Sequence, residues 1–541
     1  MLLARSSSCL VRDWAGCIVS SCLIIFGIAC ITVISVYQEK IKDEYGVVLD
    51  AGSTHTDMFI YKWTVSDVIK GTALVKQIGQ CTVTDKDGNV AGISSYVSDP
   101  EQAGQSLQSC IKSKAKKLIP SYLQDKSPIY LGATAGMRLL KETNAKAADD
   151  ILGSVRHTLA NSPFMFKDDF ARIISGEEEG LSSWVTVNYL NGALNSSQDT
   201  IQNDDTLVNQ RIVGALDMGG ASTQITFVPS KPAWHSNKLK LYGKEYQVYT
   251  HSYLCYGKKE AERRFLAQLV QESNYSSTVD NPCGPKGHQR NVTSNYLWAP
   301  PCVKGQSSKR TAFTLRGTGN YTLCAEHVSK LFNFTSCRGN SSCSFDGVYQ
   351  PPTDGVSFFA FSGYYNVIKD LNLTSNVSLG QLQVATMNIC KKSWDEIVII
   401  PGKPQFLAFY CFDAQYILTI LSRGYHFDNS TANLRFVGSV NHLNLGWTLG
   451  FMINATNLLP VENPGSVSIH LIQSGVFLSS GYRRSFTDQC WGTYMYAVRW
   501  QSVQTKTVKI TRTGAVNIMI SSFQALMFIS TTMVQAKSCD Q

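Results

Sequence analysis

Two apolar runs of the chain end in closely similar polar turns. Residues 46–49 (GVVL) lead into DAGST at 50–54, and residues 212–216 (IVGAL) lead into DMGGAST at 217–223. Glycine lets a backbone approach a ligand closely, and the exposed amides of such turns bind anions. One acid in each turn would repel a phosphate unless a cation lies between them, so Asp50 and Asp217 predict a hard divalent ion that bridges phosphate oxygens. Either turn alone is more simply a tight hairpin, whereas the matched pair favours phosphate binding.

Two further segments could complete such a site. GATAGMR at 132–138 follows a strand pattern, and its small residues would allow close packing beside a phosphate that Arg138 could bind. Packing at the start of a helix explains this segment equally well. SGEEEG at 175–180 places three acids between glycines. Acidic clusters are usually solvated surface, but this one follows an apolar run, and a carboxylate there could deprotonate a water that attacks a phosphoanhydride.

The elements that must position these residues are also duplicated. Each turn is followed by a second β-rich run, MFIY at 58–61 and ITF at 225–227, so a strand–turn–strand unit occurs twice. Helical patterns such as 261–272 lie between and after the units, which predicts an α/β protein with one unit in each of two domains. The polar, turn-rich residues 191–211 predict a loop.

An uncharged segment at 15–37 is rich in Ile, Val, Leu and Cys. At about 1.5 Å per residue it is long enough to cross a hydrocarbon core of about 30 Å. Arg5 and Arg12 precede it, so the positive-inside rule places residues 1–14 in the cytoplasm and the bulk of the chain outside. A cleaved signal peptide is the alternative, although its apolar region would be shorter. We expect a plasma-membrane protein anchored in the lipid bilayer.

Glycosylation sequons and cysteines agree with an extracellular location. All sequons follow the uncharged segment, at Asn195, Asn274, Asn291, Asn320, Asn333, Asn340, Asn372, Asn376, Asn429 and Asn454. No CxxC pair is present, which argues against a zinc cluster. An even set of cysteines in an oxidising compartment predicts five disulfides. The set comprises Cys81, Cys110, Cys255, Cys283, Cys302, Cys324, Cys337, Cys343, Cys390 and Cys411.

The net charge of +9 does not indicate nucleic-acid binding, because much of the excess lies after residue 481. The remainder is nearly balanced and has no dense basic stripe that could follow a phosphate backbone. We therefore expect no nucleic-acid partner.

Five segments resemble, in order, the conserved regions of apyrases: DAGSTHT (50–56), GATAGMR (132–138), SGEEEG (175–180), DMGGASTQ (217–224) and AFSGYY (360–365). Along roughly residues 40–465 the chain resembles the membrane-bound ecto-nucleoside triphosphate diphosphohydrolases. The resemblance implies an α/β fold of two RNase H-like domains of the actin/Hsp70/sugar-kinase superfamily, with the site in the cleft between them. It also implies hydrolysis of ATP, ADP, UTP and UDP to a monophosphate and inorganic phosphate, with Ca²⁺ or Mg²⁺ as cofactor.

The same resemblance implies the domain limits and the disulfides. Lobe I would comprise residues 45–175 with 440–462, lobe II residues 176–439, and residues 463–541 would form the C-terminal tail. The implied disulfides are Cys81–Cys110, Cys255–Cys302, Cys283–Cys324, Cys337–Cys343 and Cys390–Cys411.

Catalytic roles carry over on matching residues. The resemblance assigns Glu179 as the base that activates water, and Ser222 and Gln224 as the residues that position it. Asp50 and Asp217 would hold the cation mainly through waters, with Thr134, Trp447 and Glu179 beside them. The phosphate-binding residues would be Gly52, Ser53, Thr54, His55, Gly219, Gly220 and Ala221, with Arg138 as a further candidate.

Several positions depart from the family pattern. Glu177 stands where Gln is usual, and it could raise the pKa of Glu179 by repulsion or point to solvent. Asp57 stands where a small polar residue is common. Tyr365 and Phe406 are our candidates for stacking on the nucleobase, an interaction that tolerates any base.

The C-terminal tail departs most. The apolar run at 467–480 is interrupted by GYRR at 481–484, and at about 21 Å it is too short to span a bilayer. A weaker uncharged run follows at 514–535. Paired membrane helices are linked to oligomerisation and activity in this family, so homo-oligomerisation is an open expectation. A non-catalytic nucleotide-binding variant is the main alternative function. A kinase of the same superfold is a second alternative, against which SGEEEG and the disulfides argue.

Overall fold

The computed structural model describes residues 21–22, 25–29, 43–64, 75–194, 212–241, 244–304, 310–337, 339, 342–400, 406–428 and 434–456. All of these belong to one compact unit, Met1–Leu459. Within the predicted anchor at 15–37, the described residues 21–22 and 25–29 are helical. Among the described residues, no helix combines the length and apolar character needed to cross a membrane. Residues 195–211 of the predicted loop and the predicted tail at 463–541 lie outside the described residues.

The first sheet has the strand order β3-β2-β1-β4-β5. Strand β1 pairs antiparallel with β2 and parallel with β4. Its residues Val47, Val48 and Leu49 are fully buried, as expected of an apolar run in the middle of a sheet. The strands are β1 (Asp43–Ala51), β2 (Thr56–Thr64), β3 (Lys76–Thr82), β4 (Ile129–Ala133) and β5 (Ala171–Ile173).

The second sheet repeats this order and adds one strand at its edge, giving β14-β13-β6-β7-β9-β8. Strand β6 pairs antiparallel with β7 and parallel with β13, as β1 does with β2 and β4. The duplicated unit predicted from the two turns therefore forms the centre of each sheet. The strands are β6 (Gly214–Met218), β7 (Ser222–Phe227), β8 (Ser236–Leu241), β9 (Lys244–Leu254), β13 (Phe358–Ser362) and β14 (Leu434–Phe436).

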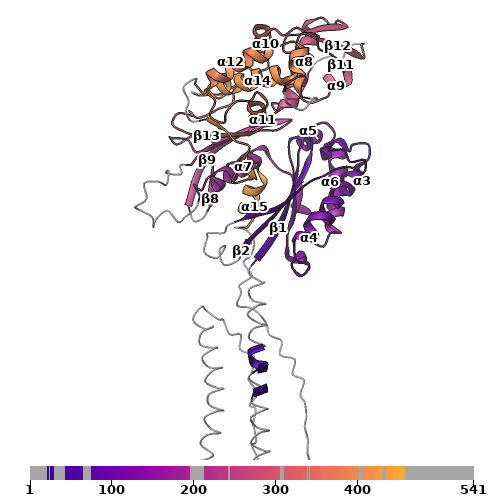
Figure 1. Cartoon of the computed structure of the whole chain (residues 1–541), viewed down its shortest axis with the longest axis vertical. Helices are drawn as coiled ribbons and strands as arrows, with labels where there is room; N and C mark the ends of the chain where they lie inside the picture. The colour runs from indigo at the N-terminus through magenta and orange to yellow at the C-terminus, as the bar shows by residue number, and fades with distance from the viewer. Residues whose placement is uncertain are drawn as a thin grey trace, which may run out of the picture. The chain divides into compact units, whose positions relative to one another are not determined.

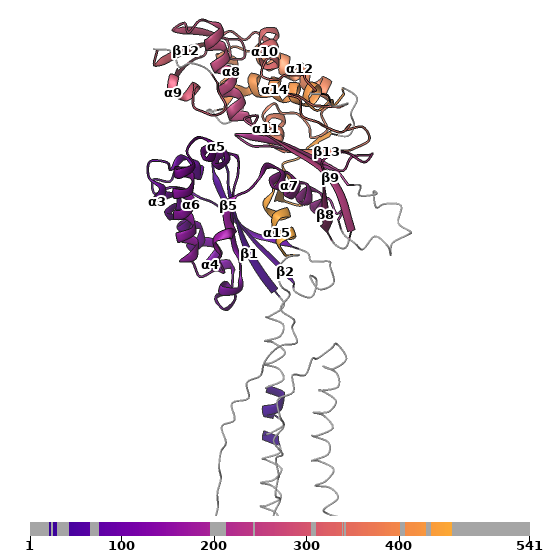
Figure 2. The same cartoon turned by 180° about the vertical axis from the view of Figure 1, so that it is seen from behind.

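Helices cover both sheets (Figures 1 and 2). Those of the first sheet are α3 (Pro100–Cys110), α4 (Lys116–Leu118), α5 (Ala135–Thr143) and α6 (Ala145–Ala160). Those that follow the second duplicated unit are α8 (Lys258–Glu272), α9 (Ser294–Leu297), α10 (Tyr321–Ser329), α11 (Gly363–Asp370), α12 (Leu379–Cys390), α13 (Trp394–Ile397) and α14 (Tyr410–Thr419). A small sheet of order β10-β12-β11 lies among them, from Thr278–Asn281, Ala312–Gly317 and Gln289–Thr293. Short hairpin strands follow at β15 (Ser439–Val440) and β16 (Leu443–Asn444).

Two helices pack between the two sheets, and we call each sheet with the helices that cover it a lobe, lobe I for the first sheet and lobe II for the second. Helices α7 (Gly176–Leu190) and α15 (Thr448–Thr456) contribute Trp184, Leu449 and Met452 to an apolar core. This core also contains Val48 from the first sheet and Phe361 from the second. Each lobe has a further core of its own. The two sheets are therefore held against a common buried layer, which fixes the strand ends of one lobe relative to those of the other.

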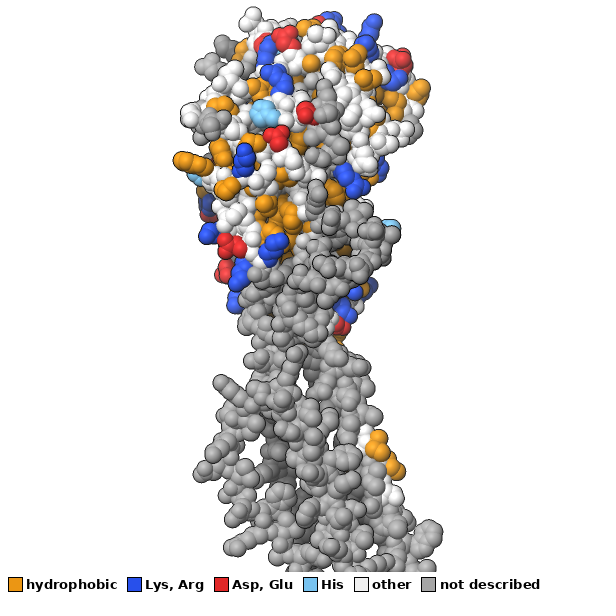
Figure 3. All heavy atoms as spheres, turned by 90° about the vertical axis from the view of Figure 1, so that its left-hand side faces the viewer, with side chains coloured by type: hydrophobic (Ala, Val, Ile, Leu, Met, Phe, Trp, Pro, Cys, Tyr) orange, Lys and Arg blue, Asp and Glu red, His pale blue; other side chains and the backbone are white. Residues whose placement is uncertain are grey.

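Covalent and surface features agree with the sequence. Disulfides join Cys81–Cys110, Cys255–Cys302, Cys283–Cys324, Cys337–Cys343 and Cys390–Cys411, the pairs that the family resemblance implies. On the face shown in Figure 3, cationic and acidic side chains are interspersed over the described residues. The sequons at Asn195, Asn340 and Asn429 lie outside the described residues. The other sequon asparagines are exposed: Asn274, Asn291, Asn320, Asn333, Asn372, Asn376 and Asn454.

Candidate active site

Glu179 lies in the first turn of α7, which begins within the SGEEEG segment. Ser175 caps the helix by accepting a hydrogen bond from an amide of the first turn at 3.0 Å. Gly176 and Gly180 lie one turn apart on the side that faces the second sheet. An added β-carbon would lie 2.2 Å from Cβ of Ser252 at the first position and 2.4 Å from a threonine hydroxyl at the second. The two glycines therefore let α7 pack directly on β7 and β9.

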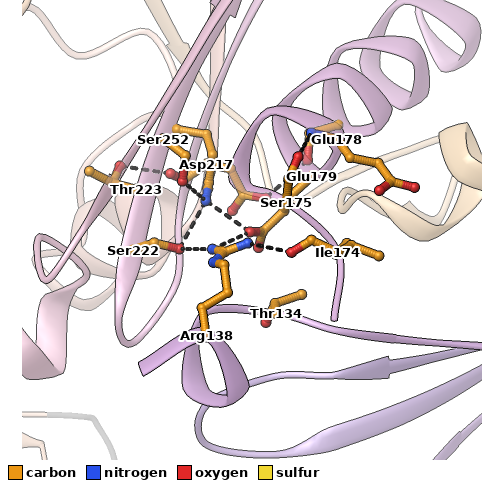
Figure 4. A network of polar contacts seen from close by, with 12 residues as sticks. Thr134, Arg138, Ile174, Ser175, Glu178, Glu179, Asp217, Ser222, Thr223 and Ser252 are labelled. Carbon is orange, nitrogen blue, oxygen red and sulfur yellow. Dashed lines mark hydrogen bonds and ion pairs between the residues drawn. The ribbon is translucent and has the colours of Figure 1, made fainter. Parts of the chain in front are cut away.

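Glu179 is buried, with 8% of its surface exposed. Its Oε2 accepts a hydrogen bond from Nη2 of Arg138 at 2.8 Å (Figure 4) and another from Nε2 of Gln224 at 3.0 Å. Burial raises the pKa of Glu179 above its ordinary value, and Arg138 counteracts part of this rise. The carboxylate is thus a stronger base than an exposed glutamate and is held in one orientation.

Arg138, on α5, connects this carboxylate with both lobes. Its Nη1 donates to the carbonyl of Ile174 at 3.1 Å, and its Nη2 also donates to Oγ of Ser222 at 3.1 Å. A planar guanidinium suits such a divided role because its donors point in fixed directions. The sequence predicted a phosphate contact for Arg138, whereas its contacts in the structure are to protein groups around Glu179.

Gln224 completes the network through the register of three neighbouring strands. It lies opposite Asp217 on β6 and opposite Ser252 on β9. Its Nε2 lies 2.9 Å from Oγ of Ser222 and 3.0 Å from Oγ of Ser252, in addition to its contact with Glu179. The three residues predicted to be catalytic, Glu179, Ser222 and Gln224, therefore share one hydrogen-bonded network.

Asp217 stands at the end of β6, 7% exposed, and accepts a hydrogen bond from Oγ of Ser183 at 3.1 Å. Burial is the main reason that its pKa rises to about 7, and repulsion from Glu179 adds to the effect. Hydrogen bonds from Ser362 and Ser183 oppose the rise. A group in this position is readily switched to its charged form by a nearby cation.

Asp50 occupies the matching position at the end of β1. Burial, and then repulsion from Glu179, raises the pKa of Asp50 well above its ordinary range, and Asp217 contributes to the same effect. The two aspartates are thus close enough to interact. No Lys or Arg side chain within the described ranges compensates either charge. Oxygen ligands with uncompensated negative charge fit a hard divalent cation.

The two hairpins meet at their tips. A β-carbon on Gly220 would lie 2.7 Å from Oγ of Ser53 and 3.1 Å from Cγ2 of Thr54, and one on Gly136 would lie 2.8 Å from Cα of Ser53. The first hairpin is therefore fitted between the second hairpin and α5. The predicted phosphate-binding turns, with Gly52, Ser53, Thr54 and His55 on one side and Gly219, Gly220 and Ala221 on the other, are brought together.

Trp447 and Thr134 lie beside Asp50. An added β-carbon on Gly132 would lie 2.3 Å from the Trp447 ring, so this glycine of GATAGMR makes room for the indole over β4. The Trp447 side chain counteracts part of the rise in the pKa of Asp50, and its buried N–H meets no hydrogen-bond partner within hydrogen-bonding distance among the described residues. Thr134 is buried, and its amide donates to the carbonyl of Ala51 at 3.1 Å.

His55 faces Asp57 in the structure. Its Nε2 lies 3.6 Å from Oδ2 of Asp57, and its Nδ1 lies 3.0 Å from Oγ1 of Thr54. The imidazole is half exposed, whereas the Asp57 side chain is 16% exposed. The described contacts of His55 are therefore within the first hairpin.

The candidate stacking residues belong to lobe II. Tyr365, on α11, lies against Gly438, where an added β-carbon would be 2.3 Å from the ring. Phe406 is 41% exposed, and Nζ of Lys258 lies 5.8 Å from its ring centroid. Lys258 also binds Asp413 at 2.8 Å, and its amide donates to the carbonyl of Gly219 at 3.0 Å. Phe406 is thus connected to the second hairpin, and its role in stacking stays a prediction.

Sequence reasoning missed three serines of the site. Ser183 and Ser362 bind Asp217, and Ser252 binds Gln224. Ser362 was within reach of prediction, because AFSGYY ends a strand that lies beside β6; Ser252 lies in no motif. Glu177 is exposed and is not among the causes of the raised Glu179 pKa, so its side chain points to solvent, the second of the two alternatives.

The arrangement combines a buried carboxylate base, hydroxyl and amide groups beside it, two uncompensated aspartates and two glycine hairpins. Such a set can orient a water, remove its proton and hold a cation-bound polyanion. It contains no serine or cysteine paired with a histidine base among the described site residues.

Comparison with known proteins agrees with the geometry. The profile of the GDA1/CD39 (nucleoside phosphatase) family matches residues 36–469. Ectonucleoside triphosphate diphosphohydrolase 8 of Gallus gallus is 43% identical over 426 residues, which cover 77% of this chain and 84% of that protein. Ectonucleoside triphosphate diphosphohydrolase 1 of Mus musculus is 40% identical over 438 residues, covering 79% and 83%.

A solved structure shows a similar fold. The nucleoside triphosphate hydrolase structure from Neospora caninum superposes with a TM-score of 0.55 at 14% identity, covering 80% of this chain and 96% of that chain. At this level of identity the similarity concerns the fold alone.

Proposed function

The chain belongs to the GDA1/CD39 (nucleoside phosphatase) family and is a hydrolase of the apyrase type, and from this premise we propose that it removes terminal phosphates from extracellular nucleoside tri- and diphosphates. ATP, ADP, UTP and UDP are the expected substrates. The products are the monophosphate and inorganic phosphate. The relatives' names, ectonucleoside triphosphate diphosphohydrolases, and the five apyrase-like motifs of the sequence support this proposal.

The observation that carries the proposal is the environment of Glu179. A buried carboxylate with a raised pKa, held by Arg138 and adjoining Gln224 and Ser222, suits a base that accepts a proton from water. The oxygen of that water attacks the terminal phosphorus, the bond to the bridging oxygen breaks, and the proton passes to Glu179. Ser222 and Gln224 orient the water in this scheme.

The hairpins would hold the phosphates, with backbone amides and the hydroxyls of Ser53 and Thr54 as donors. Asp50 and Asp217, with Thr134 and Trp447 beside them, would hold Ca²⁺ or Mg²⁺ largely through water. The cation supplies positive charge that neutralises the phosphates. Tyr365 and Phe406 would stack on the base.

The wider setting is also part of the proposal. The repeated strand order of the two sheets supports two RNase H-like lobes of the actin/Hsp70/sugar-kinase superfamily. The uncharged segment at 15–37, the exposed sequons and the disulfides support a plasma-membrane location with the catalytic lobes outside the cell.

Replacing Glu179 by Gln tests the function. The chain offers a matched control, because the neighbouring Glu178 pairs with Arg172 and does not join the network around Gln224. We expect E179Q to lower phosphate release from ATP by at least about 10³-fold while nucleotide affinity is retained, and E178Q to stay near wild type. Release is assayed without an acceptor, which also excludes a kinase. Wild-type turnover by E179Q, or no turnover by the wild type, would disprove the proposal.

A further inference from the structure

Asp57 lies just outside the first catalytic motif, but the duplication of the hairpins relates it to a residue of the candidate site. In lobe II, Asp217 and Gln224 lie directly opposite each other on β6 and β7. In lobe I, Asp50 and Asp57 lie directly opposite each other on β1 and β2. Directly opposed residues of an antiparallel pair project to the same face of a sheet. Asp57 is therefore the lobe I counterpart of Gln224 and shares a face with Asp50.

The surroundings of Asp57 do not satisfy its carboxylate. Its Oδ1 is buried and has no hydrogen-bond partner within the described part of the chain. Its Oδ2 has only the imidazole of His55, at 3.6 Å, beyond hydrogen-bonding distance. Gln224 offers its neighbours an N–H group, but an ionised carboxylate only accepts. A buried carboxylate oxygen without a donor requires a cation or a water that is itself held in place.

The charges on this face point to a cation. Burial is the main cause of the raised pKa of Asp50, and repulsion from Glu179, from Asp217 and, to the smallest extent, from Asp57 adds to it. Arg138 is directed to Glu179, and no other Arg or Lys of the described residues pairs with these aspartates. Asp50 and Asp57 on this face of the first sheet, and Asp217 at the end of β6 in the second sheet, are thus three aspartates whose repulsion a divalent ion would relieve.

We propose that Asp57 is a third carboxylate of the divalent-cation site, positioned opposite Asp50 so that its buried oxygen accepts from a water bound to the ion. This inference rests on the proposed function, which supplies the need for the cation. Asp57 is a positioning residue in this role, because it acts through the ion's water and not on the substrate. It should tighten cation binding in the absence of any nucleotide.

Cation affinity without nucleotide is the direct test. The full chain in detergent is titrated with Mn²⁺, and free Mn²⁺ is measured by electron paramagnetic resonance. We expect D57N and D57S to weaken Mn²⁺ binding by about 10-fold or more, as the loss of an outer-sphere partner typically does. Two variants guard against misfolding of one, and near-ultraviolet circular dichroism checks both. Unchanged Mn²⁺ affinity in the folded variants overturns the inference.

His55→Gln provides the matched control, since it removes the other neighbour of Asp57 and leaves the carboxylate. We expect H55Q to bind Mn²⁺ as the wild type does, or more tightly. If H55Q weakens binding as much as D57N, Asp57 acts through His55 and the inference is wrong. Phosphate release from ATP separates the two proposals: a wild type that binds Mn²⁺ but releases no phosphate disproves the hydrolysis and leaves the role of Asp57 standing.

Discussion

Arg138 determines, at the scale of single residues, how the proposed base is held. Its guanidinium contacts Glu179, Ser222 and the carbonyl of Ile174 at once. It also lowers the pKa of Glu179 against the effect of burial. An arginine with these contacts acts mainly on the base and not on the substrate. Its replacement should therefore change the pH dependence of turnover, whereas loss of a phosphate ligand would mainly raise KM.

Replacing Arg138 by Met should therefore affect turnover and its pH dependence more than affinity. Loss of the positive charge leaves burial unopposed, so the pKa of Glu179 rises and the base is ionised only at higher pH. We expect the acidic limb of the kcat/KM profile to move to higher pH and kcat to fall by about 10²-fold. Arg138→Lys should restore the limb but not the full rate, because an ammonium cannot reach three partners.

The measurement is a pH–rate profile for both variants beside the wild type. A raised KM with an unchanged acidic limb would instead identify Arg138 as a phosphate ligand, as the sequence alone suggested.

At this scale the sequence identified the residues that bear charge but not all their partners. Asp50 and Asp217 follow from acids that end apolar runs, and Glu179 follows from the family resemblance of SGEEEG; the structure brings the three into mutual interaction. Ser252 could not be foreseen, because it reaches Gln224 only through the register of β7 with β9. Pairing across strands depends on the whole sheet, which local patterns do not encode.

The glycines of SGEEEG act at the scale of the element. Gly176 and Gly180 allow α7 to lie on β9 without intervening side chains, and the catalytic turn is carried with the helix. In the sequence they resemble ordinary turn residues, and their packing role is visible only when β9 is in place. The duplicated strand pairs, in contrast, can be predicted directly from the sequence, because each apolar run leads into a polar turn and a second β-rich run.

Gly176→Ala should therefore destabilise the protein and lower kcat. The added β-carbon would lie 2.2 Å from Cβ of Ser252, which is not the free end of a flexible side chain. Overpacking of this kind costs about 1–3 kcal/mol, and displacement of α7 would move Glu179. Gly153→Ala on α6 is the matched control, since its β-carbon would meet nothing within 4 Å and should stabilise the helix by about 0.5–1 kcal/mol. Thermal unfolding and kcat of both variants decide the matter, and an equally stable, fully active G176A would contradict the packing argument.

At the scale of the whole molecule, the stability of the fold depends on α15, which returns the chain to the first lobe after the last strand of the second sheet. Gly450 of α15 packs so closely on α7 that an added β-carbon would lie 1.9 Å from the carbonyl of Ser182, and its amide donates to Oγ1 of Thr186 at 2.8 Å. Thr448 shares a hydrogen bond of 2.9 Å with the hydroxyl of Tyr61 on β2. The sequence predicted that residues 440–462 belong with lobe I, and α15 makes these contacts across the core that joins the lobes.

Two truncations with opposite outcomes follow from this arrangement. Every candidate catalytic residue lies between Asp50 and Trp447, and the inter-lobe core ends within α15. A chain ending at residue 465 should therefore keep the specific activity of the full chain in detergent.

A chain ending at residue 446 loses Trp447, Leu449, Met452 and Ile453, each buried. Burial of one such side chain contributes about 1.5–3 kcal/mol, so together they rival the net stability of a domain. We expect this shorter chain not to fold, as judged by solubility and thermal unfolding. A lower specific activity of the longer truncation would show that the atypical tail takes part in function, and an active chain ending at 446 would refute the role given to α15.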